Sequence, residues 1–150
     1  MIETVQEFIR LVNSADSADR KRAAWEEAQS SVWLTLIENH PEMRFWVAHN
    51  RTVPDDVLRK LASDLDWRVR DRIATKNACP SQILELLSHD ENEAVASTVA
   101  GHPNTPTSAL QGLERHPSGN VREKASRQLS KRGEPSVMSD NPASGGEHVQ

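Results

Sequence analysis

Apolar residues recur through the middle of the chain at a fixed interval of 26 residues. Each unit opens with a proline, and leucines follow at the fourth and seventh positions after Pro54, Pro80 and Pro106. A proline in the first turn of a helix leaves no hydrogen bond unmade, and residues three positions apart lie on one helix face. The first half of each unit is therefore predicted to be a short α-helix.

The second half of each unit keeps the same interval. Valines stand at equivalent positions, Val69, Val95 and Val121, and each is followed four residues later by another apolar residue. Residues that commonly cap helices precede them, namely Asp66, Asn92 and Ser118. Self-similarity over such an interval is typical of repeat proteins. We therefore predict an all-α chain without strands, an α-solenoid built from 26-residue units of two helices.

The two ends of the chain depart from this pattern. The unit before Pro54 is two residues shorter than the others. Residues 1–39 are predicted to form an N-terminal helical cap that contains Trp25 and Trp33, because an open solenoid end would leave apolar surface in water. Residues 40–132 form the predicted repeat region. Residues 133–150 are rich in Gly, Ser and Pro without periodicity, which predicts a disordered tail.

The phrases VRDRIATKNACPSQILELLSHD and AVASTVAGHPNTPTSALQGLERH resemble the leucine-rich repeat variant family, and the resemblance covers about residues 28 to 130. It implies a right-handed, HEAT-like superhelix in which α-helices alternate with shorter 3₁₀-like helices. Spacing alone fits an α-helix in the second half of each unit equally well, so both forms stay open. One family member carries an iron–sulfur cluster in a cysteine-rich N-terminal segment. The only cysteine here is Cys79, and that cofactor is not carried over.

Composition narrows the environment and the chemistry. The net charge of -4 argues against a protein that is basic overall and coats nucleic acid or anionic lipid. A single cysteine excludes an intramolecular disulfide. The N-terminal segment carries Glu3 and Glu7, and no apolar run approaches the length of about 20 residues that a membrane span needs. We expect a cytoplasmic protein that does not contact a membrane.

Histidines near turns and helix ends are the residues most suggestive of a metal site: His40, His49, His89, His102 and His116. They fall in different units and lack the paired spacing of metal ligands. Catalysis needs titratable groups gathered in a pocket, and small helical repeats present grooves instead. The sequence therefore predicts no metal, no cofactor, no catalytic residue and no enzymatic activity.

Arginines occupy one repeat position in three units, at Arg44, Arg70 and Arg122, and Ala96 interrupts the column. One interpretation is structural, with these side chains paired to acids of the same or the next unit, such as Asp64 and Asp90. The other is that they bind a partner.

The second interpretation gains from Arg68 and Arg72, which with Arg70 make a dense basic stretch. Residues 44–76 carry a net charge of +3, whereas residues 77–114 contain no Lys or Arg and carry -5. Such asymmetry favours a partner with the complementary pattern or head-to-tail self-association, or it is a solvated surface. The oligomeric state stays open.

Trp46 is the most informative aromatic residue, because the equivalent positions hold the polar residues Arg72, Thr98 and Lys124. This position should face outward. Trp46 then either packs beneath the cap or anchors a partner. The function predicted is a non-enzymatic scaffold for protein–protein interaction, with an unidentified protein partner and candidate binding residues Trp46, Arg44, Arg68, Arg70 and Arg72. The alternative is a nucleic-acid-binding module that uses the basic unit 44–76.

Overall fold

The structure, a computed structural model, describes residues 1–138 and is all-helical. Among these residues no strand forms, and the one β contact is an isolated bridge between Ile2 and Ala28. The all-α prediction is confirmed. The elements in chain order are α1 (Val5–Asn13), α2 (Ser17–Trp25), α3 (Ser30–Asn39), the 3₁₀-helix η1 (Pro41–Met43), α4 (Arg44–His49), α5 (Asp55–Leu61), α6 (Trp67–Ala74), α7 (Ser81–Leu87), α8 (Glu93–Gly101), α9 (Thr107–Leu113) and α10 (Gly119–Arg132).

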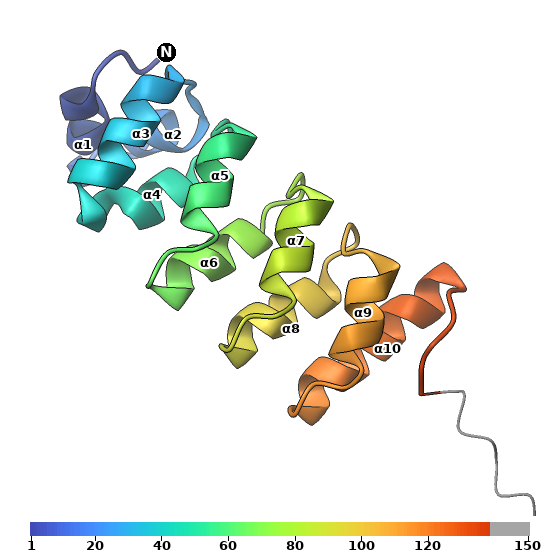
Figure 1. Ribbon diagram of the computed structural model, residues 1–150. Helices are drawn as coiled ribbons and strands as arrows, with labels where there is room; N and C mark the ends of the chain where they lie inside the picture. The colour runs from blue at the N-terminus through green and yellow to red at the C-terminus, as the bar shows by residue number, and fades with distance from the viewer. Residues whose placement is uncertain (139–150) are drawn as a thin grey trace, which may run out of the picture.

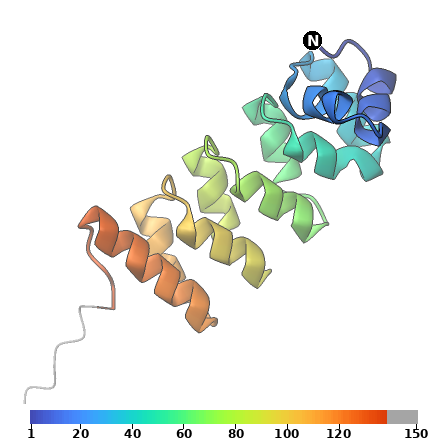
Figure 2. The ribbon, with the colours of Figure 1, turned by 180° about the vertical axis from the view of Figure 1, so that it is seen from behind.

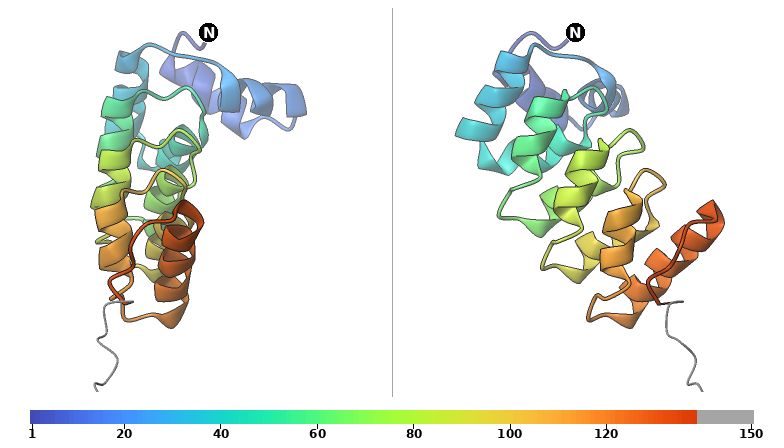
Figure 3. Two further views of the ribbon diagram at one scale, coloured as in Figure 1. Left: turned by 90° about the vertical axis from the view of Figure 1, so that its right-hand side faces the viewer. Right: turned by 45° about the vertical axis from the view of Figure 1, so that its right-hand side comes forward.

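From α3 onward the helices alternate between two rows (Figures 1 and 3). One row holds α3, α5, α7 and α9, and the other holds α4, α6, α8 and α10, which face the viewer in Figure 2. Within the second row α6 packs against α4 and α8, and α8 packs against α10. Helices α5, α7 and α9 begin directly after Pro54, Pro80 and Pro106, as the proline spacing predicts.

The core lies between the two rows. Leu58, Leu84 and Leu110 contribute from the first row, and each is at most 4% exposed. Val69, Val95 and Val121 contribute from the second row and are equally buried. Burial of one such side chain stabilises the fold by about 1.5–3 kcal/mol. The 26-residue pattern of apolar residues therefore marks the positions that fill one continuous core.

The second helix of each unit is α-helical rather than 3₁₀, which corrects the expectation drawn from the family resemblance. The Asp66 side chain accepts a hydrogen bond from the Arg68 amide at 2.9 Å, and Asn92 caps α8 in the same way. The Arg70 amide then donates to the Asp66 carbonyl, four residues back, at 3.3 Å. Side-chain caps at Asp66 and Asn92 thus satisfy amides at the starts of α6 and α8, whereas α10 is α-helical without a side-chain cap.

Helices α1 and α2 pack against each other and against α3 and α4, at one end of the two rows (Figure 3). Trp33 is fully buried there and meets Phe8 edge-to-face, with ring centroids 5.2 Å apart. Trp25 is 58% exposed, so of the two tryptophans assigned to the N-terminal cap only Trp33 is packed inside it.

A chain of hydrogen bonds joins the turns that follow α4, α6 and α8. The Asn50 side chain donates to the Ala23 carbonyl at 2.8 Å, and Lys76 Nζ donates to the Asn50 carbonyl at 2.5 Å. His102 Nε2 lies 2.7 Å from the Lys76 carbonyl, and its Nδ1 accepts from the Asn104 amide. That arrangement places the ring proton on Nε2. Three different side chains at one repeat position thus make the same contact with the preceding unit.

Residues 133–138 differ from the predicted disordered tail. Gly133 ends α10 in the left-handed region, with φ of 66°, which glycine adopts without steric cost. The chain then turns back onto α9, where Gln111 donates to the Pro135 carbonyl at 2.9 Å and the Val137 amide donates to the buried Glu114 carboxylate at 2.9 Å. The remainder of the predicted tail, residues 139–150, lies outside the described residues.

Candidate binding surface around helices α4 and α6

Arg70 forms the strongest ion pair in the described part of the chain that links two units. Its Nε and Nη2 donate to the two oxygens of Asp90 at 2.6 and 2.9 Å, and its Nη1 donates to the Asp64 carbonyl at 2.7 Å. The Asp90 side chain is only 6% exposed. Burial would raise the pKa of Asp90, but hydrogen bonds from Arg70 and from the Asn92 amide hold it below its usual value. Arg70 therefore fastens α6 to the unit that follows.

The other two arginines of this column differ in their partners. Arg44 lies 3.6 Å from Asp64 and donates to the Ile37 carbonyl at 2.6 Å. Arg122 donates to the carbonyls of His116 and Pro117, in the turn before its own helix, and forms no ion pair within residues 1–138. The predicted pairing of the column with acids is therefore confirmed for Arg44 and Arg70, which bind Asp64 and Asp90.

Arg68 and Arg72 lie on the same helix and differ in their partners. Arg68 forms an exposed ion pair with Asp66, the residue that caps α6, at 3.0 Å. The side-chain hydrogen bond from Arg68 lowers the pKa of Asp66. Arg72 makes no hydrogen bond or ion pair to a carboxylate within residues 1–138. Of the four arginines predicted to bind a partner, Arg72 alone keeps its guanidinium unpaired in the described structure.

Arg72 lines a hollow of about 420 Å³ where the ends of α4 and α6 meet the turns that follow them. The polar side chains of this basic hollow include His49, Arg51 and Lys76. Its complete lining is His49, Arg51, Val53, Asp55, Leu58, Arg72, Thr75, Lys76, Asn77 and Ala78. Arg51 was predicted only as one of the arginines of the nucleic-acid alternative, and Lys76 had no predicted role of its own. The signal that could have pointed to Lys76 is its repeat position, which Asn50 and His102 fill with uncharged groups.

The positive charges of the basic hollow act on one another. Burial, together with the charges of Arg72 and Arg51, lowers the pKa of Lys76 to about 8, although the Cys79 side chain opposes them. The pKa of His49 is lowered by burial and then by Arg72, Lys76 and Arg51. Burial raises the pKa of the Cys79 thiol to about 11, so Cys79 is a neutral, buried side chain at neutral pH. The hollow therefore holds an excess of positive charge.

Two exposed tryptophans, Trp25 and Trp46, each contact a residue that lines this hollow. The Arg51 guanidinium stacks over the Trp25 ring, 4.1 Å from its centroid. His49 meets Trp46 edge-to-face at 6.1 Å, and Trp46 meets Phe45 at 5.5 Å. Trp46 is 41% exposed and does not pack beside Trp25 or Trp33, so the alternative in which it is covered by the N-terminal helices is wrong. The outward position predicted for Trp46 is confirmed.

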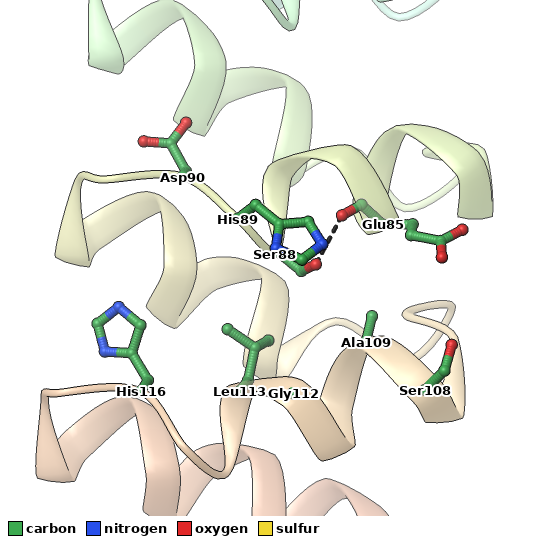
Figure 4. Close-up of a pocket in the computed structure, with 9 residues that line it drawn as sticks. All are labelled: Glu85, Ser88, His89, Asp90, Ser108, Ala109, Gly112, Leu113 and His116. Atoms are coloured by element: carbon green, nitrogen blue, oxygen red, sulfur yellow. Dashed lines mark hydrogen bonds between the residues drawn. The ribbon is translucent and has the colours of Figure 1, made fainter.

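A second hollow, of about 340 Å³, lies between α7 and α9 (Figure 4). Small residues open it, since Ala109 and Gly112 project little from α9. Its lining is Glu85, Ser88, His89, Asp90, Ser108, Ala109, Gly112, Leu113 and His116. The Asp90 carboxylate points toward the preceding pair of helices, where Arg70 holds it. Within residues 1–138 no three His, Cys, Asp or Glu side chains are placed to hold a metal ion.

Comparison of the chain with protein-family models, with curated proteins and with solved structures finds no match. None of the helices that the structure describes has the length and apolar character to cross a membrane.

Proposed function

We propose that the chain is a non-enzymatic, cytoplasmic scaffold that binds a protein partner through the exposed aromatic side of α4. The fold proposed for it is a right-handed α-solenoid of 26-residue repeats, as the resemblance to the leucine-rich repeat variant family implies. Support for the repeat comes from contacts that recur at this interval: Asp64 and Asp90 each accept the amide two residues ahead, at 2.8 and 2.9 Å. Stacked repeats commonly serve as binding scaffolds.

The observation that carries the binding proposal is the exposed pair Phe45 and Trp46. Phe45 is 37% exposed and Trp46 is 41% exposed, and they contact each other on the outer side of a helix that has only six residues. Folding alone gains little from large aromatic side chains in water, whereas Trp is enriched among the residues that dominate protein interfaces. His49, which meets the Trp46 ring, lines the basic hollow together with Arg51 and Arg72, so charged groups adjoin this surface as they do at the rim of such interfaces.

The nucleic-acid alternative has weaker support. It relies on Arg44, Arg51, Arg68, Arg70 and Arg72. Three of these, Arg44, Arg68 and Arg70, are paired with a carboxylate, which leaves Arg51 and Arg72. Affinity for nucleic acid depends on the number of phosphates that basic side chains neutralise, and it falls steeply with salt when the contacts are few. The paired arginines leave too few free charges on this surface for a track along a nucleic-acid backbone.

The test is capture of partners from the native host on the full chain, with and without nuclease, followed by binding measurements on the purified components. Trp46→Ala should weaken binding of the captured protein by about 30-fold, the loss expected at an interface anchor. The matched control is Trp67→Ala, since Trp67 is 42% exposed and lies outside the Phe45–Trp46 pair. Equal effects of the two variants would refute the assignment to α4. Loss of all captured material after nuclease treatment would support nucleic acid instead.

A further inference from the structure

The basic hollow gathers charge from two helices and the turns behind them. His49 ends α4 and Arg51 follows two residues later, while Arg72 lies on α6 and Lys76 just beyond its end. Within the hollow's lining the one carboxylate is that of Asp55. Three cationic side chains thus meet a single acid, and Lys76, with a pKa of about 8, is mostly protonated at neutral pH. The lining has a net charge close to +2 in the absence of any ligand.

Within residues 1–138 no ion pair neutralises these cations. Arg51 stacks on Trp25, and Lys76 donates to the uncharged Asn50 carbonyl. Arg70, two residues before Arg72 on the same helix, is by contrast held by both oxygens of Asp90. The fold therefore pairs the arginine that it needs and leaves Arg51 and Arg72 open to the hollow.

The repeat does not require this charge. The residues one unit after Arg51, Arg72 and Lys76 are Asn77, Thr98 and His102. His102 makes the same contact to the preceding turn that Lys76 makes, and it does so as a neutral ring. Mutual repulsion of clustered cations costs stability, and a cost that the next unit avoids points to a use at this site.

We propose that the basic hollow binds a phosphate monoester as its dianion, with Arg72 and Arg51 as the direct ligands. A group with a charge close to -2 matches the net charge of the lining, and planar guanidinium groups suit phosphate oxygens. The aliphatic walls of Val53, Leu58 and Ala78 leave room for the organic part of the ligand. This inference is independent of the scaffold proposal, because a chain that binds no protein could still bind this anion.

A diester backbone fits the hollow less well. Each diester phosphate carries one charge, and its neighbours in a nucleic acid would need further cations nearby. Arg44, Arg68 and Arg70 are already paired with carboxylates. A terminal phosphate concentrates its charge at one point, as the hollow does.

The experiment is a titration of the full chain with phenyl phosphate at constant ionic strength, in which two-dimensional NMR measures the chemical shifts at each ligand concentration. Saturable shifts are expected at the amides of His49, Arg51, Lys76 and at the Arg72 side-chain Nε–H. Arg72→Gln should weaken the apparent Kd at least tenfold. Arg68→Gln removes the same charge from the same helix but outside the hollow, and it should change the Kd less than twofold. Melting curves of both variants verify that each is folded.

Two further ligands separate the sources of the phosphate. Inorganic phosphate measures the group alone, and an N-acetylated, C-amidated Ala–phosphoserine–Ala peptide measures a phosphorylated protein side chain. Saturable binding of any of the three ligands that depends on Arg72 supports the inference, and the tightest one indicates the source. Shifts that never saturate, equal losses in the Arg72→Gln and Arg68→Gln variants, or tighter binding of random duplex DNA than of every monoester would overturn it.

Discussion

The segments 44–76 and 77–114 carry opposite charge, although the helix pairs within them, α5–α6 and α7–α8, have the same backbone plan. Each pair has a residue before its second helix that accepts the amide two positions ahead, and this residue is Asp64 in the first pair and Asp90 in the second. In the following unit His116 does the same through Nδ1, at 3.0 Å. The fold thus needs a hydrogen-bond acceptor at this position, but not a charge.

Lys76 and His102 also occupy one repeat position with different side chains. Both donate a hydrogen bond to a backbone carbonyl of the preceding turn. The segment with net charge +3 supplies every charged side chain of the basic hollow, and the segment with -5 borders the hollow between α7 and α9, where Glu85 and Asp90 are the charged residues. Charge on this molecule therefore varies independently of the 26-residue spacing of its apolar residues.

The largest predicted loss of stability comes from removing a core leucine, and it should be equal in α5 and α7, because the two helices bury equivalent residues. Leu61 and Leu87 are 1% and 2% exposed at the same repeat position. We expect Leu61→Ala and Leu87→Ala each to lower the free energy of unfolding by about 2–5 kcal/mol. Urea denaturation followed by circular dichroism measures it. A loss under about 1 kcal/mol in one unit alone would show that the units do not share one core.

The next effect distinguishes the arginines of α6. Arg70→Ala leaves the buried Asp90 carboxylate without its partner and should cost about 3 kcal/mol. Arg68→Ala breaks a pair whose side chains are 68% and 38% exposed, and it should cost less than about 1 kcal/mol. Thermal melts of the two variants, which lose the same charge from the same helix, provide the comparison. Equal destabilisation would contradict the structural role given to Arg70.

A smaller loss of stability should follow removal of the segment after Gly133, which binds the Glu114 carboxylate. Glu114 is fully buried, and burial would raise its pKa, but hydrogen bonds from Ser126, Ser136 and the Val137 amide hold it below the usual value. A chain that ends at Gly133 loses two of these donors, and we expect it to lose about 1–3 kcal/mol of stability at pH 7. A chain that ends at Met138 keeps them and is the control.

The pH dependence of this loss follows from the direction of the shift. A carboxyl group with a lowered folded pKa stabilises the protein above its unfolded pKa, and that contribution is lost as pH falls through the folded value. The gap between the parent and the chain that ends at Gly133 should therefore narrow in acid. A gap that stays constant down to pH 3 would show that Glu114 does not carry the effect.

The last effect is a change of stability with pH and concerns Lys76, which Arg72, Arg51, His49 and Asp55 surround in the basic hollow. Its folded pKa of about 8 lies below the ordinary lysine pKa of 10.5, so the unfolded chain binds more protons between these values. Stability should rise with pH in that window, by at most about 1.4 kcal/mol per pH unit. Urea denaturation at pH 7.5 to 10 should show this rise in the parent and a smaller one in Lys76→Gln. Parallel curves would remove the evidence for a charged hollow.

Sequence alone determined the elements that local spacing controls. Prolines and capping residues set the starts of α5 to α10, and apolar residues at helical intervals set the faces that are buried. The pairing of Arg70 with Asp90 was also within reach, because a repeat brings equivalent positions of neighbouring units together. The outward position of Trp46 followed from the polar residues at its equivalents.

Other features depend on how the helices pack, which spacing does not record. Trp25 was assigned to the N-terminal cap, and only the placement of α2 shows that its ring is exposed, with Arg51 from 26 residues further along the chain stacked on it. The tail was expected to be disordered from residue 133, yet buried Glu114 binds the segment that follows α10. The basic hollow forms because the ends of α4 and α6, and the turns that follow them, lie side by side. This brings together His49, Arg51, Arg72 and Lys76. Spacing along the chain reports which face of a helix is apolar, whereas the angle between neighbouring helices decides which polar side chains meet, and that angle is set by the packing of the whole core.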